Sequence, residues 1–382
     1  MTAMQATLDD FAQRIRAAAH SKTPLRIRGG GSKDFYGQTL QGEVLDTRAY
    51  QGVISYEPSE LVMTVRAGTS LREVEHLLAE KGQCLAFEPP HFGDTATVGG
   101  MVAAGLAGAS RASVGTVRDF VLGIRVLNGK GEDLTYGGQV MKNVAGYDVS
   151  RLMAGSMGQL ALITEVSLKV LPVAAGEATL AFEGLRQQQA LDALNRWGGQ
   201  PLPLNASAWL HDATSGKNML YVRLRGAAAA VEAAVVKMSA EGQALAAQVT
   251  RMGPEAQADW QASTEQSLPF FTQAPSADAC LWRLSVPQTT PDLASLGVGE
   301  HCYVEWHGAQ RWLWASAARA EALRQVAQQV GGHATLFRTS AQHGEADKAV
   351  GVFSPLEAVQ QRIQAELKHQ FDPAGVFNPG RV

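Results

Sequence analysis

The first half of the chain carries short apolar runs and helical repeats that predict a mixture of strands and helices. Leu8, Phe11 and Ile15 are spaced as on one face of an amphipathic helix, which we expect to end before Pro24. Apolar runs predict strands at Leu25–Arg28, Leu61–Val65, Val121–Leu127, Glu132–Tyr136 and Leu160–Leu171. The third and fourth strands flank the turn Asn128–Gly131 and form a predicted hairpin.

A further helix is predicted at Leu71–Lys81, directly after the second of these strands. Ser70 and Glu73 have the spacing of a capping box at its start, and Gly82 is placed as its C-terminal cap. The stretch Pro172–Glu177 closes the last strand and indicates a domain boundary.

Beyond that boundary, strands and helices alternate again. The predicted strands are Thr179–Phe182, Asn205–Leu210, Met219–Leu224, Leu281–Val286, Cys302–Trp306, Trp312–Trp314 and Ala334–Phe337; the predicted helices are Leu185–Trp197, Ala227–Ala240, Ser316–Val330 and Leu356–His369. The first five elements run strand–helix–strand–strand–helix, which resembles part of a split βαβ layer, and a second round follows. Gly253–Pro275 is polar and aromatic and fits no predicted element.

The composition is that of an ordinary globular protein of 382 residues, long enough for two domains. Its 33 basic and 36 acidic residues give a net charge of -3 without long runs of one sign, so the charge pattern does not indicate a nucleic-acid or anionic-membrane surface. Cys84, Cys280 and Cys302 are odd in number and far apart, which argues against disulfides and against a cysteine-ligated metal or iron–sulfur cluster. Since neither a secretory segment nor a membrane-spanning apolar run is found, we expect a cytoplasmic protein.

Three glycine-rich stretches are the strongest candidates for a binding site. They read RIRGGGSKDFYG at Arg26–Gly37, GDTATVGGMVAAGLAG at Gly93–Gly108 and KNVAGYDVSRLMAGSMGQLALITEVSLKVLP at Lys142–Pro172. Neither a P-loop motif nor a Rossmann G-x-G-x-x-G between strand and helix is present, so neither of these nucleotide sites fits. Consecutive glycines let backbone N–H groups converge on a pyrophosphate, whereas a flexible turn is the structural alternative for one such stretch alone.

The second stretch carries two further features of a binding site. Thr97 can cap a helix that begins at Val98, and the first N–H groups of that helix would then face an anion. The small residues after it leave room for a flat ring against the backbone, with tight packing of a helix on a sheet as the alternative.

Taken together and in order, RGGGS, PPHFGDTATVGG, RDFVLGIRVLNGKGE and GYDVSRLMAGSMGQLALITE resemble the FAD-binding domain of the vanillyl-alcohol-oxidase (PCMH-type) flavoproteins. The resemblance extends to the tail FDPAGVFNPGR, and within the family the chain is most similar to the FAD-binding E subunits of bacterial glycolate oxidases. It implies an α+β fold: a PCMH-type FAD-binding domain of two α/β subdomains at residues 1–173, an antiparallel-sheet-and-helix cap domain at 174–350, and a C-terminal segment at 351–382 that returns to the FAD domain.

The resemblance also implies site residues by position. The implied pyrophosphate cradle consists of Gly29, Gly30, Gly31, Ser32, Thr97, Gly99 and Gly100. The implied adenosine and flavin path is lined by Gly115, Gly155, Ser156, Gly158 and Ile163, with Asn378 near the isoalloxazine. Lys142, Gly146 and Asp148 match a motif but are equally open to a structural role, which for Asp148 is a helix cap. Some relatives attach FAD through a histidine where this chain has Ser32, so noncovalent FAD is expected.

The chain departs from related 2-hydroxy-acid dehydrogenases in two places. Ala104 and Gly105 replace a threonine and an asparagine near the flavin, which removes two polar contacts. The histidine-rich metal motif of relatives that oxidise lactate or glycolate is missing. His301, His307, His333 and His343 occur singly, so no metal site is expected.

The sequence assigns no catalytic residue. His307 is a candidate base, and a solvated loop histidine is the favoured alternative. A hydroxy acid needs a cation for its carboxylate, and the candidates are Arg223, Arg225, Arg283, Arg311 and Arg338. The tryptophans at 197, 209, 260, 282, 306, 312 and 314 are expected in the core or at a subunit interface. Trp312 and Trp314 share one strand face and are the preferred interface candidates.

The expected function is that of an FAD-binding subunit of a glycolate oxidase complex, which oxidises glycolate to glyoxylate and passes electrons through FAD to iron–sulfur partners. The resemblance implies a catalytic FAD-containing paralogue and an iron–sulfur subunit as partners, and a small 2-hydroxy acid as substrate. It implies no nucleic acid, and contact with the inner membrane only through these partners. The alternatives are a self-sufficient FAD-dependent 2-hydroxy-acid dehydrogenase and a scaffold subunit whose FAD has no redox role.

Overall fold

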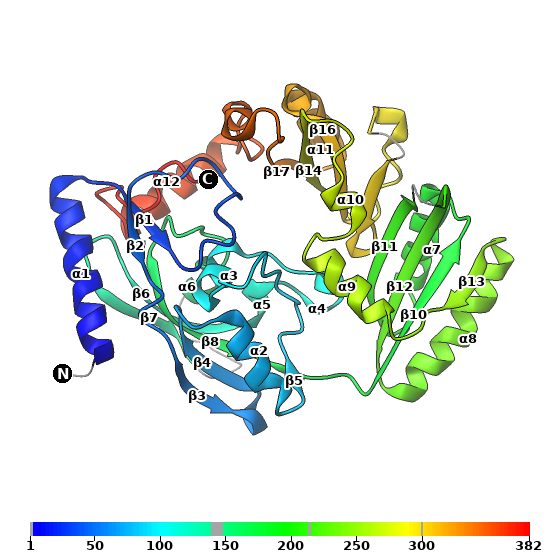
Figure 1. Cartoon of the computed structure of the whole chain (residues 1–382), viewed down its shortest axis with the longest axis horizontal. Coiled ribbons are helices and arrows are strands. Elements are labelled where there is room, and N and C mark those ends of the chain that lie inside the picture. The colour runs from blue at the N-terminus through cyan, green and yellow to red at the C-terminus, as the bar shows by residue number, and fades with distance from the viewer. Residues whose placement is uncertain (1–2, 139–147, 213–214, 299–300) are drawn as a thin grey trace. The chain divides into compact units, whose positions relative to one another are not determined.

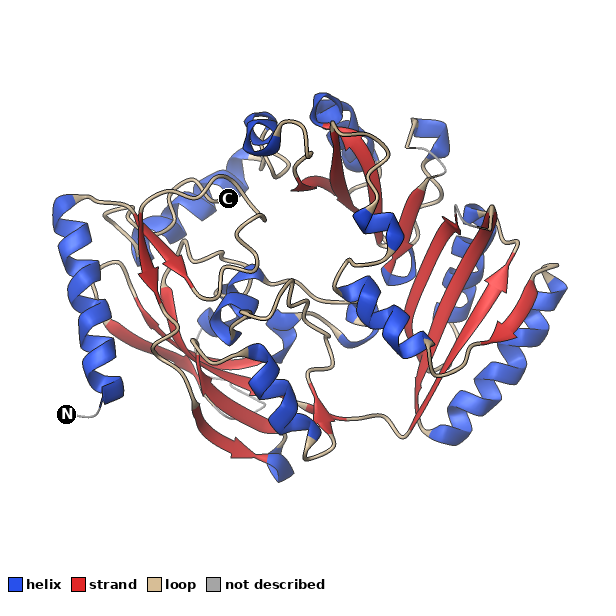
Figure 2. Ribbon diagram, viewed as in Figure 1, coloured by secondary structure: helices blue, strands red, loops and turns tan. Residues whose placement is uncertain are grey.

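The computed structural model describes residues 3–138, 148–212, 215–298 and 301–382, and the chain divides into two compact units (Figure 1). The first unit comprises residues 1–107, 115–173 and 355–382, and the second comprises 108–114 and 174–354. Residues 108–114 therefore belong to the second unit, although the chain on both sides of them belongs to the first. Helices and sheets occur in both units, which confirms the α+β class (Figure 2).

The first unit contains a five-stranded antiparallel sheet with the order β3-β4-β8-β6-β7. Its strands are β3 (Val53–Glu57), β4 (Val62–Arg66), β6 (Val121–Leu127), β7 (Asp133–Gly137) and β8 (Leu162–Lys169). Two small sheets pair β1 (Leu25–Arg28) in parallel with β2 (Glu43–Asp46), and β5 (Gln83–Cys84) with β9 (Leu171–Pro172). The helices are α1 (Ala3–Ser21), α2 (Leu71–Ala79), α3 (Val98–Ala104), α5 (Val117–Phe120), α6 (Val149–Leu152) and α12 (Ala358–Phe371), with a 3-10 turn at Pro58–Glu60.

Two predicted elements of this unit are confirmed in detail. Helix α1 buries Leu8, Phe11 and Ile15 and ends before Pro24, as its periodicity predicts. The hairpin β6–β7 is also present. Its turn is held by Asn128, whose Oδ1 accepts hydrogen bonds from the backbone N–H groups of Lys130 and Glu132.

The predicted capping box at Ser70 is wrong. Ser70 is the N-cap of α2, but its side chain makes no capping hydrogen bond. The N–H of Leu71 donates instead to the carbonyl of Ala96 at 2.9 Å, so a neighbouring segment satisfies the helix start. The helix ends at Ala79, and Gly82 follows it in the left-handed region with φ of 63°.

The second unit contains an eight-stranded antiparallel sheet with the order β13-β10-β12-β11-β15-β16-β14-β17. Its strands are β10 (Gly176–Glu183), β11 (Leu204–Asp212), β12 (Lys217–Gly226), β13 (Gln248–Arg251), β14 (Ala279–Ser285), β15 (Cys302–Glu305), β16 (Gln310–Ser316) and β17 (His333–Arg338). Its helices are α4 (Arg111–Val114), α7 (Gln187–Gly198), α8 (Ala228–Ala244), α9 (Ala256–Thr264), α10 (Pro269–Thr272) and α11 (Ala320–Gln329), and 3-10 turns lie at Ala294–Leu296, Trp306–Gly308, Ala317–Arg319 and Gly344–Val350.

This sheet is built from two copies of one strand arrangement. Within β10 to β13 the spatial order is fourth, first, third, second, and within β14 to β17 the same order runs in the opposite direction. The two halves join where the second strand of each copy pairs, with Ala208 opposite Glu305 and Trp209 opposite Val304. The predicted split βαβ layer and its second round are therefore both present.

The two faces of the sheet differ. Buried apolar side chains such as Phe182, Trp282 and Leu336 pack with α7, α8 and α11 into one core. On the opposite face, α9 and α10 account for the stretch Gly253–Pro275, in which no element was predicted. Trp260 of α9 donates from Nε1 to Thr179 Oγ1 at 3.0 Å, which fixes that helix on the sheet. Among the described residues, no helix combines the length and apolar character needed to cross a membrane.

Candidate functional site

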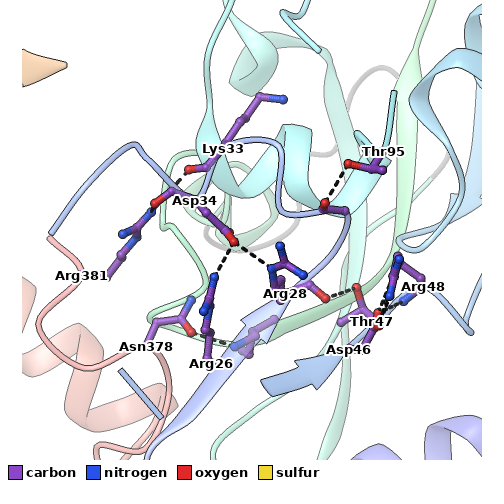
Figure 3. Close-up of polar contacts among 12 residues, drawn as sticks. Arg26, Arg28, Lys33, Asp34, Asp46, Thr47, Arg48, Thr95, Asn378 and Arg381 are labelled. Atoms are coloured by element: carbon purple, nitrogen blue, oxygen red, sulfur yellow. Dashed lines mark hydrogen bonds and ion pairs between the residues drawn. The ribbon is translucent and has the colours of Figure 1, made fainter. Parts of the chain in front are cut away.

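The first glycine stretch leaves β1 and lies directly against the second. A Cβ at Gly29 would come within 2.3 Å of Thr97 Oγ1, and one at Gly30 within 1.4 Å of the Thr95 carbonyl oxygen. Gly31 has a φ of 74°, a conformation that other residues adopt only with strain. Thr95 Oγ1 donates to the carbonyl of Gly30 at 2.7 Å (Figure 3). The backbone here has the close approach that only glycine permits.

Charged side chains surround this loop. Arg26 and Arg28 both donate to Asp34 Oδ2, with a distance of 2.8 Å from Arg28 Nε (Figure 3). Lys33 Nζ donates to the carbonyl of His91 at 3.1 Å. Since two guanidinium groups share one carboxylate, the cluster keeps a positive charge that favours a bound anion.

The second stretch forms helix α3, and Thr97 caps it as predicted. Thr97 Oγ1 accepts from the Gly100 N–H at 3.2 Å. The expectation that the first N–H groups face a ligand is wrong, because Val98 N–H donates to the Thr69 carbonyl at 3.0 Å and Gly99 N–H to the Ala67 carbonyl at 2.8 Å. Backbone carbonyls of the protein itself therefore accept hydrogen bonds from the first two N–H groups of this helix. Gly99 permits the packing, since its Cβ would lie 2.7 Å from that of Ala67.

The third stretch is attached to α3 and to the tail. Met157 N–H donates to the Ala103 carbonyl at 2.8 Å, which ties the loop to the end of α3. Asn378 lies between this loop and β1. Its Oδ1 accepts from the Ile27 N–H at 2.8 Å, and its Nδ2 donates to the Met157 carbonyl at 2.7 Å (the former bond is drawn in Figure 3). A Cβ at Gly158 would lie 2.6 Å from Asn378 Nδ2, so this position requires glycine for the clamp to close.

These three stretches and the tail line one pocket. Its lining residues are Ile27, Arg28, Gly29, Gly30, Gly31, Ser32, Lys33, Asp34, Leu40, Thr97, Gly100, Ala103, Ala104, Met157, Asn378 and Arg381. Three cationic side chains and one carboxylate are among them, which suits an anion such as a pyrophosphate. Ala103 and Ala104 leave space for a flat group beside them.

The remaining predicted residues lie outside the lining. These are Gly99, Gly115, Gly155, Ser156, Gly158 and Ile163. Ser156 adjoins the lining residue Met157, and its buried Oγ has no hydrogen-bond partner within the described ranges. A buried hydroxyl of this kind fits a polar atom of a bound group. The residues present therefore fit FAD, with a backbone cradle, cations for its phosphates and an unused buried hydroxyl.

Two motif residues, Lys142 and Gly146, lie outside the described residues. Asp148 takes the structural alternative: it is the N-cap of α6 and accepts from the Arg151 N–H at 3.2 Å.

Sequence reasoning missed the cationic residues of the pocket. Arg28, which lines the pocket, and Arg26, which does not, alternate with apolar residues along β1, a period-two signal that could have indicated a cationic strand face. Arg381 carries no such signal. It reaches the first stretch from the tail, donating from Nη2 to the Asp34 carbonyl at 2.9 Å and from Nη1 to the Gln38 carbonyl.

In the second unit, the structure sorts the candidate carboxylate-binding arginines. Arg311 is buried and donates to the carbonyls of Gly308, Thr290 and Pro291. Burial lowers the pKa of its guanidinium. The hydrogen bonds of Arg311 therefore give it a structural role.

The other four arginines lie on strands of the sheet. Arg223 donates from Nε to Asn205 Oδ1 at 2.6 Å, and Arg225 pairs with Glu177 at 2.7 Å. The guanidinium carbons of Arg283 and Arg338 lie 5.4 and 5.7 Å from the ring centre of Phe337. Burial lowers the pKa of Arg338 to about 10, so this side chain keeps its positive charge at neutral pH. Arg283 and Arg338 are thus the two candidates whose guanidinium groups lie near the same aromatic ring.

His307 is not the solvated loop histidine expected as the favoured alternative. It is 6% exposed and lies between two serine hydroxyls, with Nδ1 3.1 Å from Ser207 Oγ and Nε2 3.0 Å from Ser113 Oγ. Burial lowers the pKa of its imidazole to about 4, so the ring is neutral at neutral pH. Within the described ranges, no three His, Cys, Asp or Glu residues are grouped so as to hold a metal ion.

The preferred interface tryptophans lie in or near the core instead. Trp312 is 3% exposed, packs against Phe271 and Phe337, and donates from Nε1 to Glu305 at 2.7 Å. The interface prediction for Trp312 is therefore wrong. Trp314 is half-buried and donates to the Phe270 carbonyl at 2.7 Å.

Comparison with known proteins shows that the chain is similar to FAD-binding proteins. A family model described as FAD binding domain matches residues 2–149. Glycolate oxidase subunit GlcE of Escherichia coli is 42% identical over 370 residues, which is 97% of this chain and 95% of that protein.

Other relatives share only part of their length with this chain. D-lactate dehydrogenase of Archaeoglobus fulgidus is 30% identical over 193 residues, 50% of this chain and 43% of the relative. Glycolate oxidase subunit GlcD of Bacillus subtilis is 29% identical over 175 residues, 45% of this chain and 37% of the relative. The solved structure of an alkyldihydroxyacetonephosphate synthase covers 96% of this chain with a TM-score of 0.68, 74% of that chain being matched. At 15% identity, this last likeness concerns the fold alone.

Proposed function

Because this chain belongs to the family of the glycolate oxidase subunit GlcE and contains an FAD binding domain, we propose that it is the FAD-binding subunit of a glycolate oxidase. Such an enzyme is an FAD-dependent oxidoreductase that converts a 2-hydroxy acid, here glycolate, to the 2-oxo acid glyoxylate. The observation that carries the proposal is a pocket lined by two glycine stretches, the Met157 loop and the tail, with three cationic side chains in its lining.

The pocket residues have distinct parts in holding the cofactor. When bound, FAD supplies a two-electron acceptor for the hydride that leaves the C–H bond of the substrate. Gly29 to Gly31 bring the backbone against the pyrophosphate, and Arg28, Lys33 and Arg381 offset its charge. Asn378 holds β1 and the Met157 loop together, which fixes two sides of the pocket at once. Ser32 carries no group that links covalently to flavin in the manner of histidine, so the cofactor is held noncovalently.

The substrate carboxylate needs a cation, and Arg283 with Arg338 are the candidates we propose. Both guanidinium groups lie near the ring of Phe337 in the second unit, and that of Arg338 also donates from Nε and Nη2 to Gln266 Oε1 at 3.2 and 3.0 Å. Arg311 and Arg225 are engaged with backbone carbonyls and with Glu177 respectively.

As a subunit, the chain acts with partner subunits of the same oxidase. We propose that these include a paralogous FAD-containing catalytic subunit and an iron–sulfur subunit, which passes electrons onward from flavin. Any association with the membrane is then made through these partners. We propose a paralogue as partner because another glycolate oxidase subunit, GlcD, is similar in sequence to part of this chain.

The visible spectrum of the purified chain, before and after anaerobic addition of glycolate, tests the proposal. We expect a flavin spectrum that stays oxidised with this chain alone and bleaches when the partner subunits are added. Bleaching of the isolated chain would show a self-sufficient 2-hydroxy-acid dehydrogenase instead. A colourless protein that takes up no added FAD would leave only a scaffold and would overturn the proposal.

A further inference from the structure

The turn Trp306–Gly308, between β15 and β16, has an unusual backbone. Trp306, His307 and Gly308 have φ values of 54°, 55° and 105°, so three consecutive residues lie in the left-handed region. Two of them carry large side chains, for which this conformation is strained. A backbone of this kind persists only where surrounding contacts hold it, and both side chains are buried, at 8% and 6% exposed.

Those contacts run to the short segment 108–114. Trp306 Nε1 donates to the carbonyl of Gly108 at 2.9 Å, and the guanidinium of Arg111 lies 4.4 Å from the centre of the Trp306 ring. Near the other end of the segment, His307 Nε2 lies 3.0 Å from Ser113 Oγ. The turn therefore holds the segment at three points along its length.

The hydroxyl of Ser207 on β11 orients the imidazole. Ser207 Oγ accepts from the backbone N–H of His307 at 3.0 Å and lies 3.1 Å from its Nδ1. Nδ1 thus pairs with the Ser207 hydroxyl and Nε2 with the Ser113 hydroxyl, so both ring nitrogens of His307 have a hydrogen-bond partner. The strands thus fix the side chain that holds the segment.

Both ends of the segment continue into the FAD cradle. Only residues 105–107 separate Gly108 from Ala104, which lines the pocket at the end of α3. At the other end the chain passes to Gly115, with φ of 102°, and then to Thr116, whose N–H donates to Asp119 Oδ2 at 2.8 Å. If residues 108–114 move, the backbone that precedes them, the backbone that follows them, or both must move as well.

We propose that the turn Trp306–Gly308 is a clasp on residues 108–114, and that Trp306 and His307 are positioning residues for the FAD cradle through that segment. The proposal goes beyond the assignment of FAD as cofactor. It assigns a part in cofactor binding to residues that lie in the second unit and line no part of the pocket.

The test compares two tryptophans that make the same kind of hydrogen bond. Trp306→Phe removes the bond to Gly108, and the matched control Trp209→Phe removes the bond from a buried indole to the Leu185 carbonyl, also 2.9 Å long. We expect Trp306→Phe to raise the Kd for FAD of the full-length apoprotein by about fivefold, while Trp209→Phe leaves it within twofold of wild type. Hydrogen exchange at residues 105–116 should rise in Trp306→Phe only.

A second pair of variants, at exposed residues, keeps the test valid if a variant at a buried tryptophan fails to fold. Ser113 is exposed, so Ser113→Ala removes its bond to His307 without opening a cavity, and exposed Ser276→Ala removes a bond to Asp278 as control. Ser113→Ala should weaken FAD binding in the same direction as Trp306→Phe, and Ser276→Ala should not. Equal FAD affinity in each variant and its control would overturn the clasp. Failure of the wild type itself to bind FAD would instead refute the proposed function.

Discussion

Gly30 has no room for a side chain, because a Cβ there would meet the Thr95 carbonyl oxygen at 1.4 Å. We expect Gly30→Ala to force the loop away from the second glycine stretch and to weaken FAD binding at least tenfold, which corresponds to about 1.4 kcal/mol. Flavin fluorescence during titration of the apoprotein measures this. Gly138→Ala is the matched control in the same unit, since a Cβ at Gly138 meets no atom of the described residues within 4 Å. Similar FAD affinity for both variants would contradict the cradle.

Asn378 allows a second test at the scale of one residue. In Asn378→Asp, a carboxylate oxygen replaces the Nδ2 group that donates to the Met157 carbonyl, so two acceptors face each other in a buried place. We expect a loss of about 2–3 kcal/mol in the free energy of unfolding. Urea unfolding followed by circular dichroism measures it.

Asn378→Ala is the comparison for that variant, because it removes both hydrogen bonds without adding charge and should lose less. Protonation of the new carboxyl at low pH restores a donor toward Met157. The difference in the free energy of unfolding between Asn378→Asp and wild type should therefore become smaller as the pH falls. A difference that stays constant with pH would show that the amide is not a clamp.

At the scale of elements, the pair β15–β16 buries the carboxyl group of Glu305, whose hydrogen-bond donors among the described residues are uncharged. Glu305 Oε2 accepts from Gln310 Nε2 and Trp312 Nε1, and Oε1 accepts from Ser263 Oγ at 3.0 Å. Burial raises the pKa of this carboxyl above its usual value near 4.5. A raised pKa means that the folded state holds the proton more tightly, so the group lowers stability as the pH rises above 4.5.

Glu305→Gln should remove that pH dependence. A glutamine can keep an oxygen toward the two N–H donors and turn its NH2 group to the Ser263 hydroxyl. We expect the variant to match wild type near pH 4.5 and to unfold at higher urea concentration than wild type at pH 8. Urea midpoints at both pH values measure this. A wild-type midpoint that rises more steeply with pH than that of the variant would contradict it.

Elements were predictable where their own periodicity determines them, as in α1, the hairpin β6–β7 and the strands of the eight-stranded sheet other than the edge strand β13. The helices α9 and α10 were not, because the aromatic residues that fix them, such as Trp260, have partners on distant strands. The capping box at Ser70 failed for a similar reason, since a bond from Leu71 to Ala96 replaces it. Local patterns cannot show which distant backbone satisfies a helix end.

For the candidate site, too, residues with a local sequence pattern were predicted and residues defined by distant contacts were not. Glycines were found from sequence because a missing Cβ is visible in the composition of a loop, and Gly29 to Gly31 do line the pocket. The cations were missed because a lone arginine such as Arg381 looks like any surface charge. The bond between His307 and Ser113 spans 194 positions, and neither residue has a local pattern that marks it.

At the scale of the whole molecule, all seven tryptophans lie within residues 174–354, whereas the FAD pocket lies in the first unit. Tryptophan fluorescence during urea unfolding therefore reports on the second unit alone. FAD at a hundred times its Kd stabilises the unit that binds it by about 2.7 kcal/mol.

If residues 108–114 couple the unfolding of the two units, FAD bound to the first unit also raises the free energy of unfolding of the second unit, which contains the tryptophans. We expect saturating FAD to raise the urea midpoint measured by tryptophan fluorescence in the wild type, and to raise it less in Ser113→Ala, where one hold on the shared segment is lost. Far-ultraviolet circular dichroism of the same samples reports both units and supplies the internal comparison. An FAD effect on circular dichroism with none on tryptophan fluorescence would mean that the units unfold independently. The effect should depend on FAD concentration with the Kd found in direct titration, because only binding to the folded state can produce it.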